Sequence, residues 1–401
     1  MRRIEVRETA ANWAALERQR FTMRETALVI LLVVAFGYFS IFVTNGAGSA
    51  AIADSTADWL VASAFVEGVD PYAHLHELSE HFGVAYLDSD ADERVSNAPR
   101  TPGALVLLAP LALLGGPEQA RAAMLVIGVG AVAATFLLIG RAVPISTIAL
   151  VIGLAAALVS GPARWSFLFV TQSPIVMCLV AVVVLTAMQG DRYTIGLALA
   201  VAGTLKVFPL VLVVSLIVMR RWRAVTATAV GLGVLNLIPL LMPNVSLAPM
   251  VSAMTDTAEA WIDLTIGIPG LVAQWSTSSN LLTVSLVAVA TIGFASVPVV
   301  RRNVTMQLGA LGLLSASLLV LPISWPHYVL TLIPVWMLID QDASLRRPVV
   351  VLLILGGVML VPLTPIALHT AGLVLIVIAV ATQGFYARQP ISAGTRTATM
   401  I

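Results

Sequence analysis

The chain is a succession of apolar runs separated by short polar breaks, beginning with residues 28–43. A helix needs roughly 20 apolar residues to cross a hydrocarbon core of about 30 Å. Because such runs recur from residue 101 to the end, the pattern predicts an all-α polytopic membrane protein with one bundle of 11 to 13 transmembrane helices. The later runs cover residues 102–115, 122–140, 145–160, 166–188, 224–242, 281–299, 305–322, 328–339, 348–364 and 367–386.

The composition supports this class and excludes others. Hydrophobic residues make up 59% of the chain and charged residues only 11%, against roughly 25% charged residues in soluble domains. No basic stripe interleaved with aromatic residues is present, so nucleic acid is not an expected partner. Cys178 is the only cysteine, which excludes an intramolecular disulfide and a cysteine-built metal site.

Arginines mark one side of the predicted membrane. The tail of residues 1–25 contains six arginines and directly precedes the first apolar run, so the positive-inside rule places it in the cytoplasm. A single transmembrane domain is then expected over residues 26–386, with a second cytoplasmic tail at 387–401. Further arginine clusters separate later pairs of runs, at Arg220, Arg221 and Arg223, at Arg301 and Arg302, at Arg346 and Arg347, and at Arg388.

Residues 45–100 form a long polar loop with ten acidic residues and only two arginines, as expected of an extracytoplasmic loop at the cell membrane. Asp54 and Asp58 are four apart, so on a short helix they share one face. A carboxylate there can act as a general base if a substrate hydroxyl comes within about 3 Å. Ordinary solvated acids remain the alternative. Gly68 to Tyr72 predict a turn that ends this helix, because Pro71 restrains its own backbone and that of Asp70.

Lys206 lies in the apolar stretch 195–219, where a lysine at membrane depth costs about 2.5–3.5 kcal/mol on insertion scales. Either its side chain points into a polar cavity, or the chain breaks at Pro209 into two half-helices. An anionic partner is expected, either Asp54 or a lipid phosphate. Arg100, where the loop re-enters the membrane, is suited to gripping a phosphate with its planar fork, although it can equally snorkel.

Other polar residues interrupt the apolar runs near their ends. Trp325, His327 and Tyr328 form a turn at the start of a late run, and Gln172 and Asn280 occur in short polar clusters. Gln172 and Asn280 can each hydrogen-bond a sugar, and helix–helix hydrogen bonding is the alternative. For the histidine of the turn, packing at the membrane interface is the alternative. His74, His76 and His81 are interpreted as solvated side chains, so no metal site is expected.

Over residues 26–385, the order and spacing of these motifs resemble glycosyltransferase family 87 of the GT-C superfamily. In this family the donor is a polyprenol-phosphate sugar. The chain departs from the family pattern in having Thr171 before Gln172, where the family often has glycine. The motifs that carry the resemblance are Asp54 about eighteen residues before Gly68-Val69-Asp70-Pro71-Tyr72, Trp59, Asn97-Ala98-Pro99-Arg100-Thr101-Pro102-Gly103, Thr171-Gln172-Ser173, Leu205-Lys206-Val207-Phe208-Pro209 before Arg220-Arg221-Trp222-Arg223, and His327-Tyr328.

The resemblance implies a GT-C-like bundle with catalysis at the outer loop. Asp54 would be the base in the transfer of mannose, with inversion, from polyprenol-phosphate mannose to a glycolipid or lipoglycan. Lys206, His327 and Arg100 would bind the donor phosphate, so that neither a metal nor another cofactor is needed. Membrane lipids complete the expected partners. Sugar or acceptor contacts are expected from Asp58, Trp59, Tyr72, Asn97, Gln172, Asn280, Trp325 and Tyr328.

Two alternatives stay open. The same fold can use polyprenol-phosphate arabinose, as an arabinofuranosyltransferase. A transporter or lipid flippase would also bury a lysine and break helices near the middle of the membrane. Transporters often contain internal repeats, which this chain lacks, and the long acidic loop favours the glycosyltransferase.

Overall fold

The computed structural model describes residues 27–41, 54–84, 98–262, 265–275, 281–339, 345–362 and 366–386. Every regular element in these ranges is a helix, which confirms the predicted all-α class. In chain order they are a first helix Ala27–Ile41, α2 (Asp54–Glu67), α3 (Leu75–Phe82), α4 (Pro102–Leu108), η2 (Ala109–Leu113), α5 (Pro117–Ala142), α6 (Thr147–Val159), α7 (Gly161–Leu168), α8 (Ser173–Gln189), α9 (Tyr193–Leu205), η3 (Phe208–Val211), α10 (Leu212–Val218), α11 (Trp222–Leu237), η4 (Pro239–Leu241), α12 (Leu247–Trp261), α13 (Ile268–Trp275), α14 (Leu281–Val300), α15 (Met306–Val320), η6 (Pro326–Thr331), α16 (Leu332–Ile339), α17 (Arg347–Leu360) and α18 (Ile366–Tyr386).

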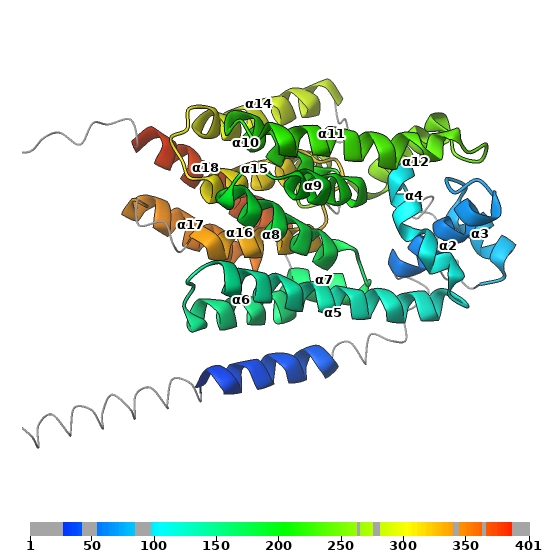
Figure 1. The fold of residues 1–401 in the computed structure, drawn as a ribbon, viewed down its shortest axis with the longest axis horizontal. Helices are drawn as coiled ribbons and strands as arrows, with labels where there is room; N and C mark the ends of the chain where they lie inside the picture. Colours follow the sequence, from blue (N-terminus) through cyan, green and yellow to red (C-terminus); the bar gives the residue numbers. More distant parts are fainter. Residues whose placement is uncertain are drawn as a thin grey trace, which may run out of the picture.

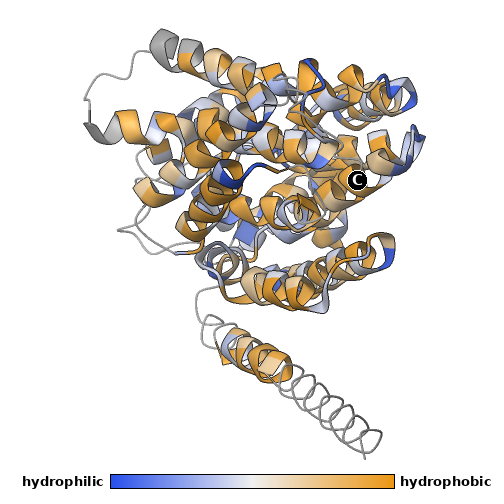
Figure 2. Ribbon diagram, turned by 90° about the vertical axis from the view of Figure 1, so that its left-hand side faces the viewer, coloured by the Kyte–Doolittle hydropathy of each residue, from blue (hydrophilic) through white to orange (hydrophobic). Residues whose placement is uncertain are grey.

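The longer helices lie side by side in a bundle, and α2, α3 and α4 gather at one end of it (Figure 1). The most extensive packing is between α9 and α11, α17 and α18, and α5 and α8. Hydrophobic residues run along most of each helix, with hydrophilic residues mainly near the helix ends (Figure 2). Large apolar side chains such as Val126 and Leu241 are exposed. Such a surface suits lipid better than water.

Within the described ranges, three helices are long and apolar enough to cross a membrane: Pro117–Ala142, Trp222–Leu241 and Ala367–Tyr386. A fourth results if α6 and α7, which meet at a bend of 50°, are one span. Nine further apolar helices are 10–17 residues long, shorter than the roughly 20 residues a straight span needs. A membrane-type helical fold is therefore supported, and the figure of 11 to 13 crossings stays a prediction.

Two of the predicted apolar runs are broken. The prediction of one run over 166–188 is wrong, because α7 ends at Leu168 and α8 begins at Ser173. Between them Val170 has a left-handed backbone with φ 49°, which a β-branched residue rarely adopts. In the stretch 195–219, α9 ends at Leu205 and the backbone is extended at Lys206 (φ −147°, ψ 124°). The break therefore comes three residues before Pro209.

The predicted turn after α2 is confirmed. Gly68 has φ 78°, a conformation that glycine adopts without steric cost. The Tyr72 backbone N–H then donates to Asp70 Oδ1 at 2.9 Å. Asn244, between η4 and α12, donates from Nδ2 to the carbonyl oxygens of Phe65 and Val69 at 3.3 and 3.0 Å. A distant part of the chain therefore holds the end of α2 in place.

Two hydrophobic cores organise the described residues. The larger one fills the bundle and includes residues of η3, α15, η6 and α16. The smaller one joins α2, α3, α4 and η2 to the start of α5 at the end of the bundle. At the opposite end, Arg221 Nη2 donates to the carbonyl of Ala187 at 3.1 Å and Arg302 Nη2 to that of Val218 at 2.7 Å. The acidic helix α2 and these arginine clusters thus lie at different ends, as the positive-inside rule expects of the two sides of a membrane.

Candidate active site

A cavity of about 410 Å³ lies where α2 and the start of α4 meet the bundle. This volume is within the roughly 300–1,000 Å³ of small-molecule sites. One part of its wall is polar, with Asp54, Arg100, Lys206, His327 and Tyr328. The rest is mostly apolar and aromatic, formed by Ala57, Leu75, Ala98, Pro99, Thr101, Trp165, Phe169, Leu205, Val207, Phe208, Met254, Thr257, Ala258, Trp261, Leu321, Pro322, Ile323 and Trp325.

Asp54 is the first residue of α2, and its partly buried side chain faces the cavity. Burial raises the pKa of its carboxyl group, the positive charges of Arg100 and Lys206 lower it, and Asp58 raises it again. The result is a raised pKa. A carboxylate with a raised pKa is a stronger base than one in open solvent.

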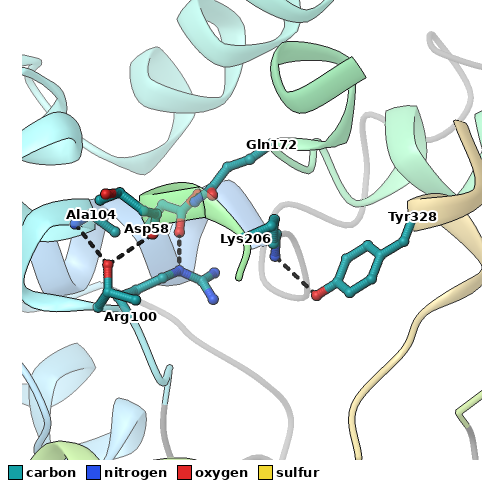
Figure 3. A network of polar contacts seen from close by, with 8 residues as sticks. Asp58, Arg100, Ala104, Gln172, Lys206 and Tyr328 are labelled. Atoms are coloured by element: carbon teal, nitrogen blue, oxygen red, sulfur yellow. Dashed lines mark hydrogen bonds and ion pairs between the residues drawn. The ribbon is translucent and has the colours of Figure 1, made fainter. Parts of the chain in front are cut away.

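Arg100 is held by a carboxylate that does not face the cavity. Its Nε donates to Asp58 Oδ1 at 2.7 Å, and Gln172 Nε2 donates to Asp58 Oδ2 at 2.9 Å (Figure 3). Burial alone lowers the pKa of Arg100, but the Asp58 and Asp54 charges and the hydrogen bond to Asp58 outweigh it and raise the pKa. The guanidinium therefore stays charged beside the cavity.

Lys206 is the only lysine among the 401 residues. Its Nζ donates to the hydroxyl oxygen of Tyr328 at 3.1 Å (Figure 3) and lies 4.9 Å from the centre of that ring. The first sequence alternative is found, since Lys206 lines a cavity, and the helix also breaks, but at Lys206 and not at the predicted Pro209. The break after α9 thus places one compact positive charge, the Lys206 ammonium group, in an otherwise apolar stretch.

Two hydrogen bonds hold the segments that carry Arg100 and Lys206 close together. Thr101, next to Arg100, donates from Oγ1 to the carbonyl of Thr204 at 2.8 Å. The Gly103 backbone N–H donates to Asn236 Oδ1 at 3.1 Å. Thr101 therefore fastens the segment before α4 to the end of α9, two residues before Lys206, and Gly103 fastens α4 to α11.

Gly103 makes this fastening sensitive to substitution. A Cβ there would lie 2.7 Å from Thr204 Cγ2 and 2.8 Å from the Leu235 backbone oxygen. We expect Gly103→Ala to lower the free energy of unfolding by about 1–3 kcal/mol, measured as a lower Tm in detergent. Gly130→Ala is the matched control, because nothing lies within 4 Å of its Cβ position. Equal Tm values for the two variants would contradict the close approach of this segment to α11.

Aromatic rings form a part of the wall that adjoins His327. Trp325 stacks on His327 and on Trp165 with ring centres 6.5 and 6.4 Å apart, and contacts Trp261 edge-on at 5.5 Å. His327 is 3% exposed, and within the described chain neither of its ring nitrogens has a hydrogen-bond partner. Its ring lines the cavity, and both nitrogens are enclosed there without a partner among the described residues.

Comparison with protein families decides the class of the protein. The model of "Glycosyltransferase family 87" matches residues 101–324, more than half of the chain. The chain belongs to glycosyltransferase family 87. No curated protein matches it. Membership confirms the predicted enzyme class, and the transporter alternative is set aside.

In this family 87 glycosyltransferase, the structure brings together one group of the predicted site residues and leaves others apart. Asp54, Arg100, Lys206, His327, Trp325 and Tyr328 line one cavity, although they are far apart in sequence. Asp58 and Gln172 lie behind Arg100, while Trp59 and Tyr72 are buried in the smaller core. Of these four, none lines the cavity. Asn97 and Asn280 lie outside the described residues.

Sequence reasoning predicted Trp325 but missed three other aromatic residues in the cavity wall of the family 87 enzyme. Trp165, Phe169 and Trp261 line the cavity but lie in separate parts of the sequence. The spacing of Trp165 and Phe169, four apart at the end of α7, was the available signal, since such residues share a helix face. Within the described residues, no group of three histidine, cysteine, aspartate or glutamate side chains is arranged to hold a metal ion. His76 instead contacts Glu80 at 3.2 Å on the exposed surface.

Proposed function

We propose that this glycosyltransferase moves a mannosyl residue from polyprenol-phosphate mannose to a glycolipid or lipoglycan acceptor. The reaction takes place on the extracytoplasmic side of the cell membrane and inverts the anomeric carbon. The supporting observation is a single cavity lined by the Asp54 carboxylate and by the side chains of Arg100, Lys206 and His327.

The proposed chemistry is a single displacement. An acceptor hydroxyl attacks the anomeric carbon of the donor sugar, and its proton passes to Asp54. The bond between the anomeric carbon and the phosphate oxygen breaks, and the polyprenol phosphate leaves with the bonding electrons. One carboxylate suffices, because inversion forms no covalent glycosyl–enzyme intermediate. The raised pKa of Asp54 suits it to accept this proton.

The leaving phosphate gains one negative charge in this step. Fixed positive groups that face a developing charge are a major source of catalysis. Lys206 and Arg100 supply two such charges from the cavity wall, and His327 adds ring nitrogens that have no hydrogen-bond partner in the described part of the chain. Asp54 begins α2, Arg100 lies just before α4, and Lys206 follows α9. A donor lipid between these elements would contact the Asp54 carboxylate and the two cations at the same time.

The apolar part of the wall supports a lipid-borne substrate. Met254, Leu321 and Ile323 line the cavity together with the tryptophans. Aromatic faces also pack against the apolar faces of sugar rings. Trp325 and Tyr328, next to His327, are therefore proposed to contact the sugar, whereas Trp59 and Tyr72 are too deep in the smaller core for a direct contact.

The test is a transfer assay with purified protein in proteoliposomes. The protein is supplied with radiolabelled polyprenol-phosphate mannose or polyprenol-phosphate arabinose and a lipid extract. We expect label from the mannose donor in a new glycolipid. Transfer from the arabinose donor alone would replace mannose by the alternative donor of the same fold. Failure with both donors would overturn the proposed donor class.

A further inference from the structure

Asp58 is a buried carboxylate that the proposed reaction does not use. It lies on α2 one turn after Asp54, it is 0% exposed, and it does not line the cavity. We propose that Asp58 and Gln172 hold the Arg100 guanidinium against the cavity, so that Asp58 is a positioning residue and not a second base. This inference rests on the proposed function, in which Arg100 faces the donor phosphate.

Both oxygens of Asp58 already have partners. Oδ1 accepts from Arg100 Nε at 2.7 Å and Oδ2 accepts from Gln172 Nε2 at 2.9 Å. A general base must come within hydrogen-bond distance of the hydroxyl that it deprotonates. Asp58 is separated from the cavity by the group that it binds, whereas Asp54 faces the cavity directly. The two carboxylates of α2 are therefore suited to different tasks.

Binding through Nε leaves the other end of Arg100 for a ligand. The terminal nitrogens lie on the side of the guanidinium away from Asp58 (Figure 3). Within the described chain, they make no hydrogen bond or ion pair with another residue. A guanidinium offers its donors in a planar fork that matches two phosphate oxygens. Fixing Nε therefore fixes the direction in which this fork points.

Gln172 is itself held rigidly. The turn before it contains Val170, whose left-handed backbone and 3% exposure combine strain with burial. Thr171 Oγ1 shares a 2.8 Å hydrogen bond with Ser166 Oγ and accepts from the Ser173 backbone N–H at 3.3 Å. Strained residues persist where the surrounding structure determines them strongly and are common near functional sites. The turn thus directs the Gln172 amide at Asp58 across 114 residues of sequence.

Asp58 and Arg100 also affect the pKa of Asp54 through their charges. The charged or titratable side chains that face Asp54 are Arg100, Lys206, His327 and Tyr328 in the cavity, with Asp58 behind. The other such groups of the helices packed on α2 lie outside the cavity wall, namely His76, Glu77, Glu80 and His81 of α3 and Glu118, Arg121 and Arg141 of α5. Removing the Asp58 charge removes an effect that raises the pKa of Asp54 and leaves Arg100 without its neutralising partner.

The test compares Asp58→Asn with Gln172→Met in the full-length protein. Asparagine still accepts a hydrogen bond from Arg100 but carries no charge, and methionine keeps the volume of glutamine without its amide. We expect both variants to lower kcat about tenfold or more. Only Asp58→Asn should also move the acidic limb of the kcat/KM profile to lower pH, by roughly 0.5 unit or more. Asp70→Asn, the same change at an exposed carboxylate of the same loop, should alter neither.

Binding of labelled polyprenol phosphate gives a second readout that does not need transfer. Asp58→Asn should bind this lipid several-fold more tightly, since Arg100 is no longer neutralised, and Gln172→Met should not. If Asp58→Asn keeps both the wild-type pH profile and wild-type binding of the lipid, Asp58 does not position Arg100 and the proposal is overturned. Loss of all transfer in Asp58→Asn with retained transfer in Asp54→Asn would make Asp58 the base. If the wild-type protein neither binds the lipid phosphate nor transfers sugar, the proposed function itself fails.

Discussion

The Asp54→Asn variant is expected to lose sugar transfer by about 10²–10⁴-fold while it still folds and binds the donor lipid. The asparagine amide has nearly the shape of the carboxylate but cannot take the proton of the acceptor hydroxyl. Because the change removes a group needed only in the transfer step, kcat should fall much more than donor affinity. The measurement is single-turnover transfer of labelled sugar, with donor binding determined on the same preparation.

Asp70→Asn is the matched control for Asp54→Asn, since Asp70 holds the turn after α2 and does not line the cavity. It should transfer sugar at the wild-type rate. Asp54→Glu should keep part of the activity, because a carboxylate remains on the same helix. Normal turnover by Asp54→Asn would remove Asp54 from the role of base.

The second large effect is expected at Lys206. Lys206→Met should weaken binding of the polyprenol-phosphate donor by about 10–100-fold, the equivalent of losing a charged hydrogen bond of roughly 1.5–3 kcal/mol. Methionine keeps the length of the side chain but loses the charge. The dissociation constant is measured with labelled donor in the absence of acceptor. Tyr328→Phe removes only the hydroxyl that Lys206 contacts, and should change the constant less. Unchanged donor affinity in Lys206→Met would place the phosphate elsewhere.

The absence of any other lysine from the sequence allows a direct check of the same residue. An amine-selective reagent can label only Lys206 and the amino terminus, and peptide mapping separates the two. Bound donor should slow labelling of Lys206 and leave the amino terminus unaffected. Equal labelling with and without donor would show that the ammonium group does not face the lipid phosphate.

The helical class and the turn after α2 followed from local sequence. Apolar runs predicted helices because their side chains need an apolar environment, and Gly68 with Pro71 predicted a turn because of backbone geometry. The break near Lys206 was also expected, since a lysine and a proline in one apolar stretch disfavour a straight helix. The four predicted catalytic and phosphate-binding residues line one cavity, and their roles stay predictions.

Long-range contacts could not be predicted in the same way. Asp58 and Arg100 are 42 residues apart and Asp58 and Gln172 are 114 apart, so no local pattern indicates that the three side chains meet. Spacing alone gave Asp54 and Asp58 equivalent positions on one helix face. Tertiary packing distinguishes them, because one carboxylate faces a cavity and the other is enclosed. The break at Val170 was missed for a similar reason, since the contacts that impose its backbone conformation come from the folded chain.

The two hydrophobic cores have a consequence for the durability of the enzyme. The helix α2, which begins with Asp54, is anchored in the smaller core, and Lys206 lies beside residues of the larger one, so the reacting groups are aligned only while both cores keep their relative position. A detergent that loosens the contact between α2 and the bundle would separate the base from the cations while most of the helices stay intact. Loss of catalysis would then precede loss of helical structure, and helix content would be a poor guide to whether a solubilised preparation is competent.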